Sequence, residues 1–190
     1  MTEHIEQRPV GKQFNNSYDI VIVGSGLVGA SLCLAFAGTA KAYGLSIALL
    51  DAAPIAANTP SAAGALDGRA TALALGSRNL LHSIGLWQHL APHAQAISNI
   101  QVSDQGQPWK SEMQAGDMQT EALGYVLQNQ TMGQVFLQQI TQRCSEFVHL
   151  IDQAQVTAID NARQNSHLEY QRLGQAQSLT AQLIVMADGG

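Results

Sequence analysis

The stretch that decides the fold is Tyr18-Asp19-Ile20-Val21-Ile22-Val23-Gly24-Ser25-Gly26-Leu27-Val28-Gly29. Its first six residues are mostly apolar and β-branched, which predicts a short buried strand. The three glycines that follow have the spacing Gly-x-Gly-x-x-Gly. In this motif the first glycine makes a tight turn, the second lets the backbone approach a pyrophosphate, and the third packs the helix against the strand.

The chain continues as a strand–helix–strand unit. Residues 27–43 are rich in alanine and leucine and end before Gly44, which predicts a helix, and residues 46–50 predict a second buried strand. Such a unit of about thirty residues favours a parallel sheet. Backbone N–H groups at the helix start, from Ser25 through Leu27 and Val28, would then face the phosphates of a nucleotide.

Asp51 closes the second strand, 22 residues beyond Gly29. A carboxylate at this place can accept hydrogen bonds from ribose hydroxyls, and it favours a ribose without a 2′-phosphate. The sequence therefore predicts an adenine dinucleotide site at this strand end. The motif does not choose between FAD and NAD.

The rest of the chain completes an α/β fold. Helices are expected at 71–87 and 131–146, after a loop at 52–68, and strands at 96–102, 122–127 and 147–151, with a polar stretch at 103–120. Three late strands, separated by turns at 161–165 and 174–177, predict an inserted antiparallel three-stranded piece: 155–159, 167–171 and 179–186.

We expect one domain, at 18–190, preceded by a flexible N-terminal tail at 1–17. Residues 183–187 have the pattern of a buried strand, and they lead into Asp188-Gly189-Gly190. A core strand that runs into a glycine turn normally leads to another element. We therefore expect this domain to be incomplete at its C-terminal end.

The composition excludes several classes of protein. The 190 residues carry a formal net charge of −5 without a Lys/Arg cluster, which argues against a nucleic-acid partner. Cys33 and Cys144 are too few for a disulfide framework, and Cys33 is expected to pack inside the first helix. Three histidines near Trp87 lack a carboxylate or cysteine partner, so no metal site is predicted: His82, His89 and His93.

Residues 20–40 form the one stretch long enough to suggest a membrane span, because they contain no charged residue. Three glycines crowd its first half and β-branched residues begin it, which favours the strand, turn and helix described above. Residues 1–18 are polar and have no apolar core of a signal peptide. We expect a cytoplasmic protein.

Two further strings could carry chemistry. Arg69 follows the loop and precedes a predicted helix, so its planar fork of donors could reach a phosphate or ribose, or could be a solvated surface group. Asp188 and Gly189 follow a buried strand, where a carboxylate could meet a cofactor ribose, although Asp-Gly is also an ordinary turn signal. These residues alone leave both alternatives open.

With these strings in order, the chain resembles the class A flavoprotein aromatic hydroxylases, and within them the ubiquinone-biosynthesis branch. The resemblance covers nearly all of residues 18–190. It is carried by the glycine motif, Asp67 to Ser77, Ile84 to Trp87, Ile97 to Asp104, Leu123 to Val126, and Ala187 to Gly189. It implies a Rossmann-like FAD-binding domain.

The resemblance also implies the roles of site residues. The FAD pyrophosphate would lie at Gly24 to Gly29 and the adenosine ribose on Asp51. Arg69 resembles the family arginine that contacts the cofactor, and Asn129 resembles a polar position near the flavin. Asp188 and Gly189 resemble a motif associated with both FAD and NAD(P)H.

The implied activity is hydroxylation of a polyprenylated phenol in ubiquinone biosynthesis, with FAD, NAD(P)H and O2. It implies peripheral association with the inner face of a membrane, or with a biosynthetic complex. The family continues for about as many residues again, and neither its glycine–aspartate motif nor much of its substrate site is present in this sequence. No catalytic residue is identified, and the choice of NADH or NADPH stays open.

Two other functions compete with this one. The chain could be a nucleotide-binding module or an inactive fragment without turnover. It could also be an NAD-dependent dehydrogenase, against which the Arg69 string, the inserted strands and the lack of a clear catalytic histidine or Tyr-Lys pair argue.

Overall fold

The computed structural model describes residues 16–55, 68–103, 110–162 and 165–189. The chain divides into two compact units. One takes in the described residues of 1–65 and 136–190, and the other those of 66–135. Of the tail expected at 1–17, residues 1–15 lie outside the described residues. Ser17 is already the first residue of the first strand.

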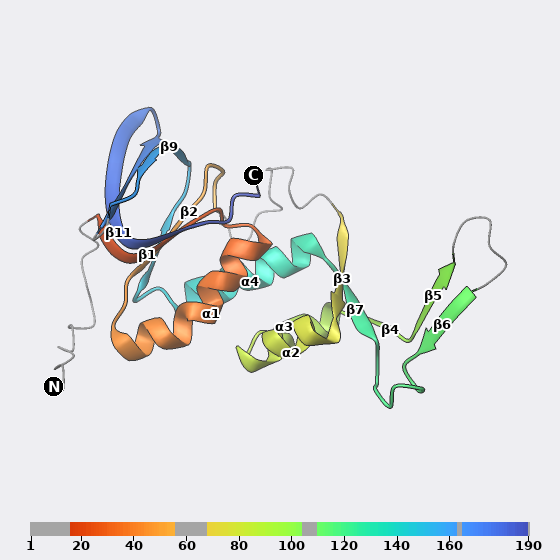
Figure 1. Ribbon diagram of the computed structural model, residues 1–190. Helices are drawn as coiled ribbons and strands as arrows, with labels where there is room; N and C mark the ends of the chain where they lie inside the picture. Colours follow the sequence, from red (N-terminus) through yellow and green to blue (C-terminus); the bar gives the residue numbers. More distant parts are fainter. Residues whose placement is uncertain (1–15, 56–67, 104–109, 163–164, 190) are drawn as a thin grey trace. The chain divides into compact units, whose positions relative to one another are not determined.

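The first unit is built on a six-stranded sheet in the order β8-β2-β1-β11-β10-β9 (Figure 1). Its strands are β1 (Ser17–Val23), β2 (Ile47–Leu50), β8 (Val148–Ile151), β9 (Ala154–Asp160), β10 (Ser166–Arg172) and β11 (Gln175–Met186). Four adjacent strands are mutually parallel: β8, β2, β1 and β11. The strand β10 is antiparallel to both of its neighbours, β11 and β9. The predicted parallel sheet and antiparallel three-stranded piece are both confirmed.

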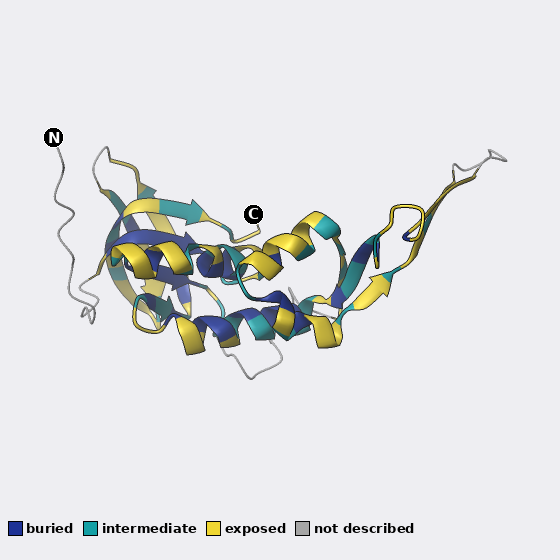
Figure 2. Ribbon diagram, turned by 90° about the horizontal axis from the view of Figure 1, so that it is seen from below, coloured by how far each residue is buried: buried dark blue, intermediate teal, exposed yellow. Residues whose placement is uncertain are grey.

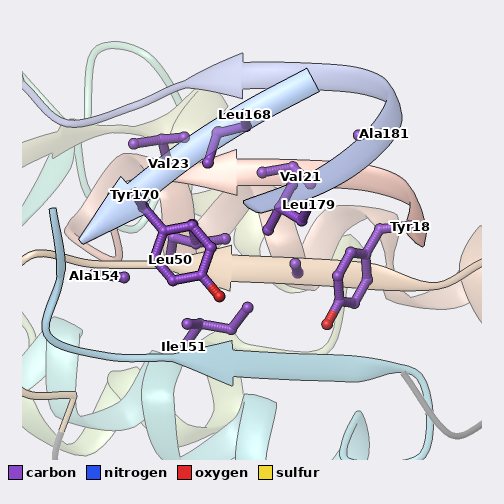
Figure 3. Packing of buried hydrophobic residues seen from close by; sticks show 11 residues of the cluster. Tyr18, Val21, Val23, Leu50, Ile151, Ala154, Leu168, Tyr170, Leu179 and Ala181 are labelled. Carbon is purple, nitrogen blue, oxygen red and sulfur yellow. The ribbon is translucent and has the colours of Figure 1, made fainter. Parts of the chain in front are cut away.

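A hydrophobic cluster fills one face of this sheet. Val21, Val23 and Leu50 come from the parallel strands, whereas Leu168 and Leu179 come from β10 and β11. Figure 3 shows β11 curving and β10 crossing over the parallel strands, so that the two sets of side chains meet. The antiparallel piece therefore closes the core instead of extending a flat sheet.

The opposite face carries helix α1 (Leu27–Tyr43). Its bounds are those that the sequence predicts. The helix ends before Gly44 because this glycine takes a left-handed conformation (φ 64°). Ile22 of β1 faces this helix, and Cys33 is fully buried in it. This burial confirms the expected packing of Cys33 as a small apolar group, and it raises the pKa of the thiol to about 12.

No helix in the described part of the chain combines the length and apolar character that crossing a membrane requires.

A tyrosine–histidine pair on the sheet predicts a pH effect on stability. The Tyr18 hydroxyl lies 2.6 Å from Nδ1 of His149, and burial raises the Tyr18 pKa to about 12, so the hydroxyl keeps its proton. Burial first, and the Arg172 charge second, lower the pKa of His149. Below pH ~6.5 the unfolded chain takes up this proton before the folded chain does. The free energy of unfolding should therefore fall as pH drops below ~6.5 and level off below the folded pKa.

His149→Gln removes this titration. Urea unfolding at about pH 7.5 and about pH 5.5 should show a smaller loss of stability on acidification in the variant than in the unchanged protein. Equal losses in the two proteins would contradict the interpretation.

The second unit contains an antiparallel sheet in the order β3-β7-β4 and a separate ribbon of β5 and β6. The strands are β3 (Ala70–Ala74), β4 (Gln95–Ile97), β5 (Asn99–Ser103), β6 (Lys110–Gln114) and β7 (Gly124–Gln128). The helices are α2 (Leu75–Ser83), α3 (Trp87–Leu90), a 3₁₀ turn (Ala91–His93) and α4 (Asn129–Arg143), which ends in the first unit. Trp87 packs edge-on against Tyr125 at 4.8 Å between ring centres.

The predicted helix at 71–87 is wrong in its first part. Residues 70–74 form β3, which pairs with the whole of β7, and the helix begins only at Leu75. The run Ala-Thr-Ala-Leu-Ala has a good local propensity for helix, and pairing with a distant strand overrides it. A second break at Gly85, with φ 73°, separates α2 from α3.

A predicted strand, a predicted polar stretch and a predicted turn also need correction. The strand expected at 96–102 is two strands in different sheets, β4 and β5. The polar stretch 103–120 contains β6, whose five residues are all exposed (Figure 2). Because the strand buries no face, its sequence has no alternation of apolar and polar residues by which it could be predicted. β11 begins at Gln175, so most of the turn expected at 174–177 is strand. Most of the loop at 52–68 and part of the turn at 161–165 lie outside the described residues.

Candidate functional site

The glycine turn follows β1 at the carboxyl end of the parallel strands. Gly24 has φ 101°, a conformation that side chains rarely adopt, and its N–H donates to the Leu50 carbonyl at 2.7 Å. A Cβ on Gly24 would lie 2.4 Å from the Ala187 carbonyl oxygen. The turn thus needs glycine both for its backbone conformation and for the close approach of the end of β11.

Gly29 holds α1 against the turn. A Cβ added there would lie 1.9 Å from the Gly24 carbonyl oxygen and 3.3 Å from Cγ2 of Ile22. This is the close helix–strand packing that the third glycine of the motif serves.

Gly26 differs from the other two glycines. Its φ of −63° and ψ of −173° are open to other residues, and a Cβ there would meet no described protein atom within 4 Å. The packing of the described residues therefore does not require a glycine at this position. A residue without a side chain leaves free the space through which a bound group could reach the backbone.

The start of α1 offers donors to such a group. Gly26 is the N-cap, no side chain caps the helix, and its first turn holds no acidic residue. The N–H groups of Leu27, Val28 and Gly29 have no carbonyl one turn earlier within the helix. Together with the positive end of the helix dipole, they form an anion-binding end suited to a pyrophosphate.

Asp51 lies beside this turn. Its Oδ2 accepts hydrogen bonds from the Ser25 N–H at 2.7 Å and from the Ser25 hydroxyl at 2.6 Å, and its Oδ1 accepts one from the Ala53 N–H at 2.9 Å. Its backbone is also held, because its N–H donates to the Ile151 carbonyl and its carbonyl accepts from the Ala154 N–H. Asp51 therefore lies against the glycine turn, a contact that the sequence did not predict, and its role on a ribose stays a prediction.

Asp188 and Gly189 lie at the same end of the sheet. The Ala187 N–H donates to the Val23 carbonyl at 2.7 Å, and a Cβ on Gly24 would lie 2.8 Å from Cα of Asp188. Gly189 has φ 82°, so the chain turns there in a conformation that favours glycine. The sequence did not predict the packing of Ala187 against Gly24, because that contact depends on the parallel pairing of β1 with β11.

Arg69 and Asn129 lie together in the second unit. The Asn129 N–H donates to the Arg69 carbonyl at 2.8 Å, at the end of the β3–β7 pair. The Thr71 hydroxyl donates to Oδ1 of Asn129 at 2.6 Å and so orients this amide. The sequence analysis did not predict the contact of Thr71 with Asn129. It placed residue 71 in a helix, whereas the contact depends on the pairing of β3 with β7.

The site residues of the first unit fit an adenine dinucleotide. A pyrophosphate needs N–H donors and close backbone approach, which the start of α1 and Gly26 supply. A ribose needs a fixed hydroxyl acceptor, which Asp51 supplies. Across the described ranges, no three His, Cys, Asp or Glu side chains gather in a way that could hold a metal ion.

Comparison with known sequences places this geometry in a family. The pattern of the FAD binding domain family matches residues 17–190. Ubiquinone hydroxylase UbiL of Rhodospirillum rubrum is 32% identical over 183 residues, which are 95% of this chain and 39% of that protein. The mitochondrial ubiquinone biosynthesis monooxygenase COQ6 of Dictyostelium discoideum is 26% identical, over 93% of this chain and 38% of that protein.

Solved structures share the fold. The crystal structure of p-nitrophenol 4-monooxygenase PnpA from Pseudomonas putida superposes with a TM-score of 0.69 at 18% identity, over 91% of this chain and 41% of that one. OxyS anhydrotetracycline hydroxylase from Streptomyces rimosus also has a TM-score of 0.69, at 16% identity, over 92% of this chain and 32% of that one.

The chain spans about two fifths of the length of these curated relatives, within the part that binds FAD in the family pattern. With its Gly-x-Gly-x-x-Gly turn, its acidic strand end and the match over residues 17–190, this chain belongs to the FAD binding domain family, and its cofactor is FAD.

Proposed function

We propose that the full-length protein is an FAD-dependent monooxygenase that hydroxylates a polyprenylated phenol in ubiquinone biosynthesis. The similarity to ubiquinone hydroxylase UbiL over 95% of this chain carries the proposal, and the similarity to COQ6 supports it. Within the ubiquinone-biosynthesis branch the sequence most resembles 2-octaprenyl-6-methoxyphenol hydroxylase, so we propose that reaction in particular. The overall reaction would consume NAD(P)H, a proton and O2, place one oxygen atom on the phenol and release the other as water.

This chain's own residues bind and orient the cofactor in the proposal. The N–H groups that begin α1 hold the pyrophosphate, and Asp51 holds the adenosine ribose. Arg69 and Asn129 of the second unit contact the cofactor, as do Asp188 and Gly189 at the end of β11. When bound, FAD supplies the electron transfer and oxygen chemistry, while the protein orients the reactants and excludes water.

A polyprenylated substrate is strongly apolar, so we propose that the full-length protein works at the surface of a membrane or within a biosynthetic complex. A vesicle flotation assay with the full-length protein tests this directly. Recovery of the protein with the vesicles would support membrane association.

Removing the Asp51 carboxylate should weaken FAD binding strongly. Hydrogen bonds to charged groups contribute about 1.5–3 kcal/mol, so Asp51→Ala should raise the FAD dissociation constant about 10- to 100-fold. Asp160→Ala is the matched control, because Asp160 is an exposed acid of the same unit on β9. Fluorescence titration of the two full-length variants checks this, and equal affinities would contradict the role of Asp51.

The proposed activity is tested with the full-length protein, a short-chain polyprenyl phenol, and each of NADH and NADPH. We expect phenol-stimulated oxidation of the reduced nicotinamide and a product that gains one oxygen atom, labelled when ¹⁸O2 is supplied. FAD binding without hydroxylation of any ubiquinone-precursor phenol would contradict the proposal. It would favour the non-catalytic binding module.

A further inference from the structure

The Ser25 hydroxyl acts on Asp51 in a way that the glycine motif does not require. Two donors of one residue, the backbone N–H at 2.7 Å and the hydroxyl at 2.6 Å, bind the same carboxylate oxygen, Oδ2. The backbone N–H alone would tether that oxygen. The hydroxyl adds a second, charge-assisted bond, which is shorter and stronger than a neutral one.

These contacts leave a specific part of the carboxylate open. An ionised carboxylate offers about four acceptor positions, two on each oxygen. Ser25 fills both positions on Oδ2, and the Ala53 N–H fills one on Oδ1. Among the contacts of the described residues, the one position left open is therefore on Oδ1.

We propose that Ser25 is a positioning residue for FAD, which fixes Oδ2 of Asp51 and so presents Oδ1 to a hydroxyl of the adenosine ribose. The inference rests on FAD binding as described above, and it concerns how Asp51 is aimed. Ser25 lies between Gly24 and Gly26, so the same bonds couple the ribose acceptor to the turn that meets the pyrophosphate. The two halves of the adenosine diphosphate site are then held as one preorganised unit.

Ser25→Ala tests the hydroxyl alone, since the variant keeps the backbone N–H. Loss of one hydrogen bond predicts an FAD dissociation constant raised about 3- to 10-fold in the full-length protein. Ser25→Thr keeps a hydroxyl at a residue whose φ is not positive, and should restore most of the affinity. Ser83→Ala is the matched control, because its hydroxyl also bonds within the protein, to the Leu80 carbonyl, and should leave the affinity unchanged.

A double-mutant cycle shows whether Ser25 acts through Asp51. In the Asp51→Ala background the effect of Ser25→Ala should shrink to less than about twofold. A general loss of folding would lower affinity in both backgrounds, so the cycle distinguishes positioning from simple destabilisation.

A pair of nucleotides locates the effect on the ribose. ADP and 2′,3′-dideoxy-ADP are each used to displace FAD, and their dissociation constants are calculated with the FAD affinity of each protein. The dissociation constant of ADP should be higher in Ser25→Ala than in the unchanged protein. The dideoxy compound lacks the hydroxyls that Asp51 would bind, so its own affinity should be the same in both proteins.

Three results would overturn the inference: unchanged or tighter FAD binding by Ser25→Ala, an equal effect in the Asp51→Ala background, or equal weakening of ADP and dideoxy-ADP. Failure of the unchanged full-length protein to bind FAD would instead overturn the function on which the inference rests. Weakening by Asp51→Ala without any effect of Ser25→Ala would leave that function standing and reject only the positioning role.

Discussion

Gly29→Ala is expected to destabilise the first unit severely, by about 3 kcal/mol or more in the free energy of unfolding. The new methyl group would lie 1.9 Å from the Gly24 carbonyl oxygen, which is far inside van der Waals contact. Neither atom belongs to a flexible side-chain end, so α1 would have to move away from β1. The movement would also disturb the glycine turn, and FAD binding should be lost with it.

Gly38→Ala provides the matched control in the same helix. A Cβ there would meet no described protein atom within 4 Å, and alanine is a better helix former than glycine by up to about 1 kcal/mol. Chemical unfolding should therefore show Gly38→Ala as neutral or more stable. A Gly29→Ala variant with the stability of the unchanged protein would contradict the close packing of α1 on the turn.

Gly26→Val should have the opposite profile, with folding retained and FAD binding abolished. The backbone of Gly26 is open to valine, and its Cβ would meet open space in the described protein. The side chain would occupy the approach of the pyrophosphate to the helix N–H groups. Loss of two charge-assisted hydrogen bonds corresponds to a dissociation constant raised at least about 100-fold.

Two measurements on Gly26→Val check this prediction. Its free energy of unfolding in urea should fall by no more than about 1 kcal/mol, the cost of valine in place of glycine at the N-cap, while titration with FAD should show little or no binding. Normal FAD affinity in a folded Gly26→Val variant would contradict the phosphate role of the turn.

The sequence predicted the parts of the fold that depend on local signals. The strand at 18–23, the helix at 27–43 and Asp51 at a strand end all lie within one short unit, whose glycine spacing and apolar runs are readable in order. The late antiparallel strands were also predictable, because alternation marks β9 and β10.

The sequence failed where distant pairing decides the structure. β3 has a helix-forming composition and becomes a strand only through its register with β7. β6 is wholly exposed and is recognisable only from its partner β5. The neighbourhood of Arg69 and Asn129 follows from the β3–β7 pairing, so it could be inferred from a family resemblance but not from spacing.

Hydrogen exchange in the presence and absence of FAD tests the central claim most directly, because it locates the cofactor on the chain. In the free full-length protein, the N–H groups of Leu27 and Val28 lack intrahelical acceptors and, unlike that of the buried Gly29, should exchange quickly. Bound FAD should slow exchange at these residues, since its pyrophosphate accepts their hydrogen bonds. Binding of FAD with no added protection at the start of α1 would contradict the account.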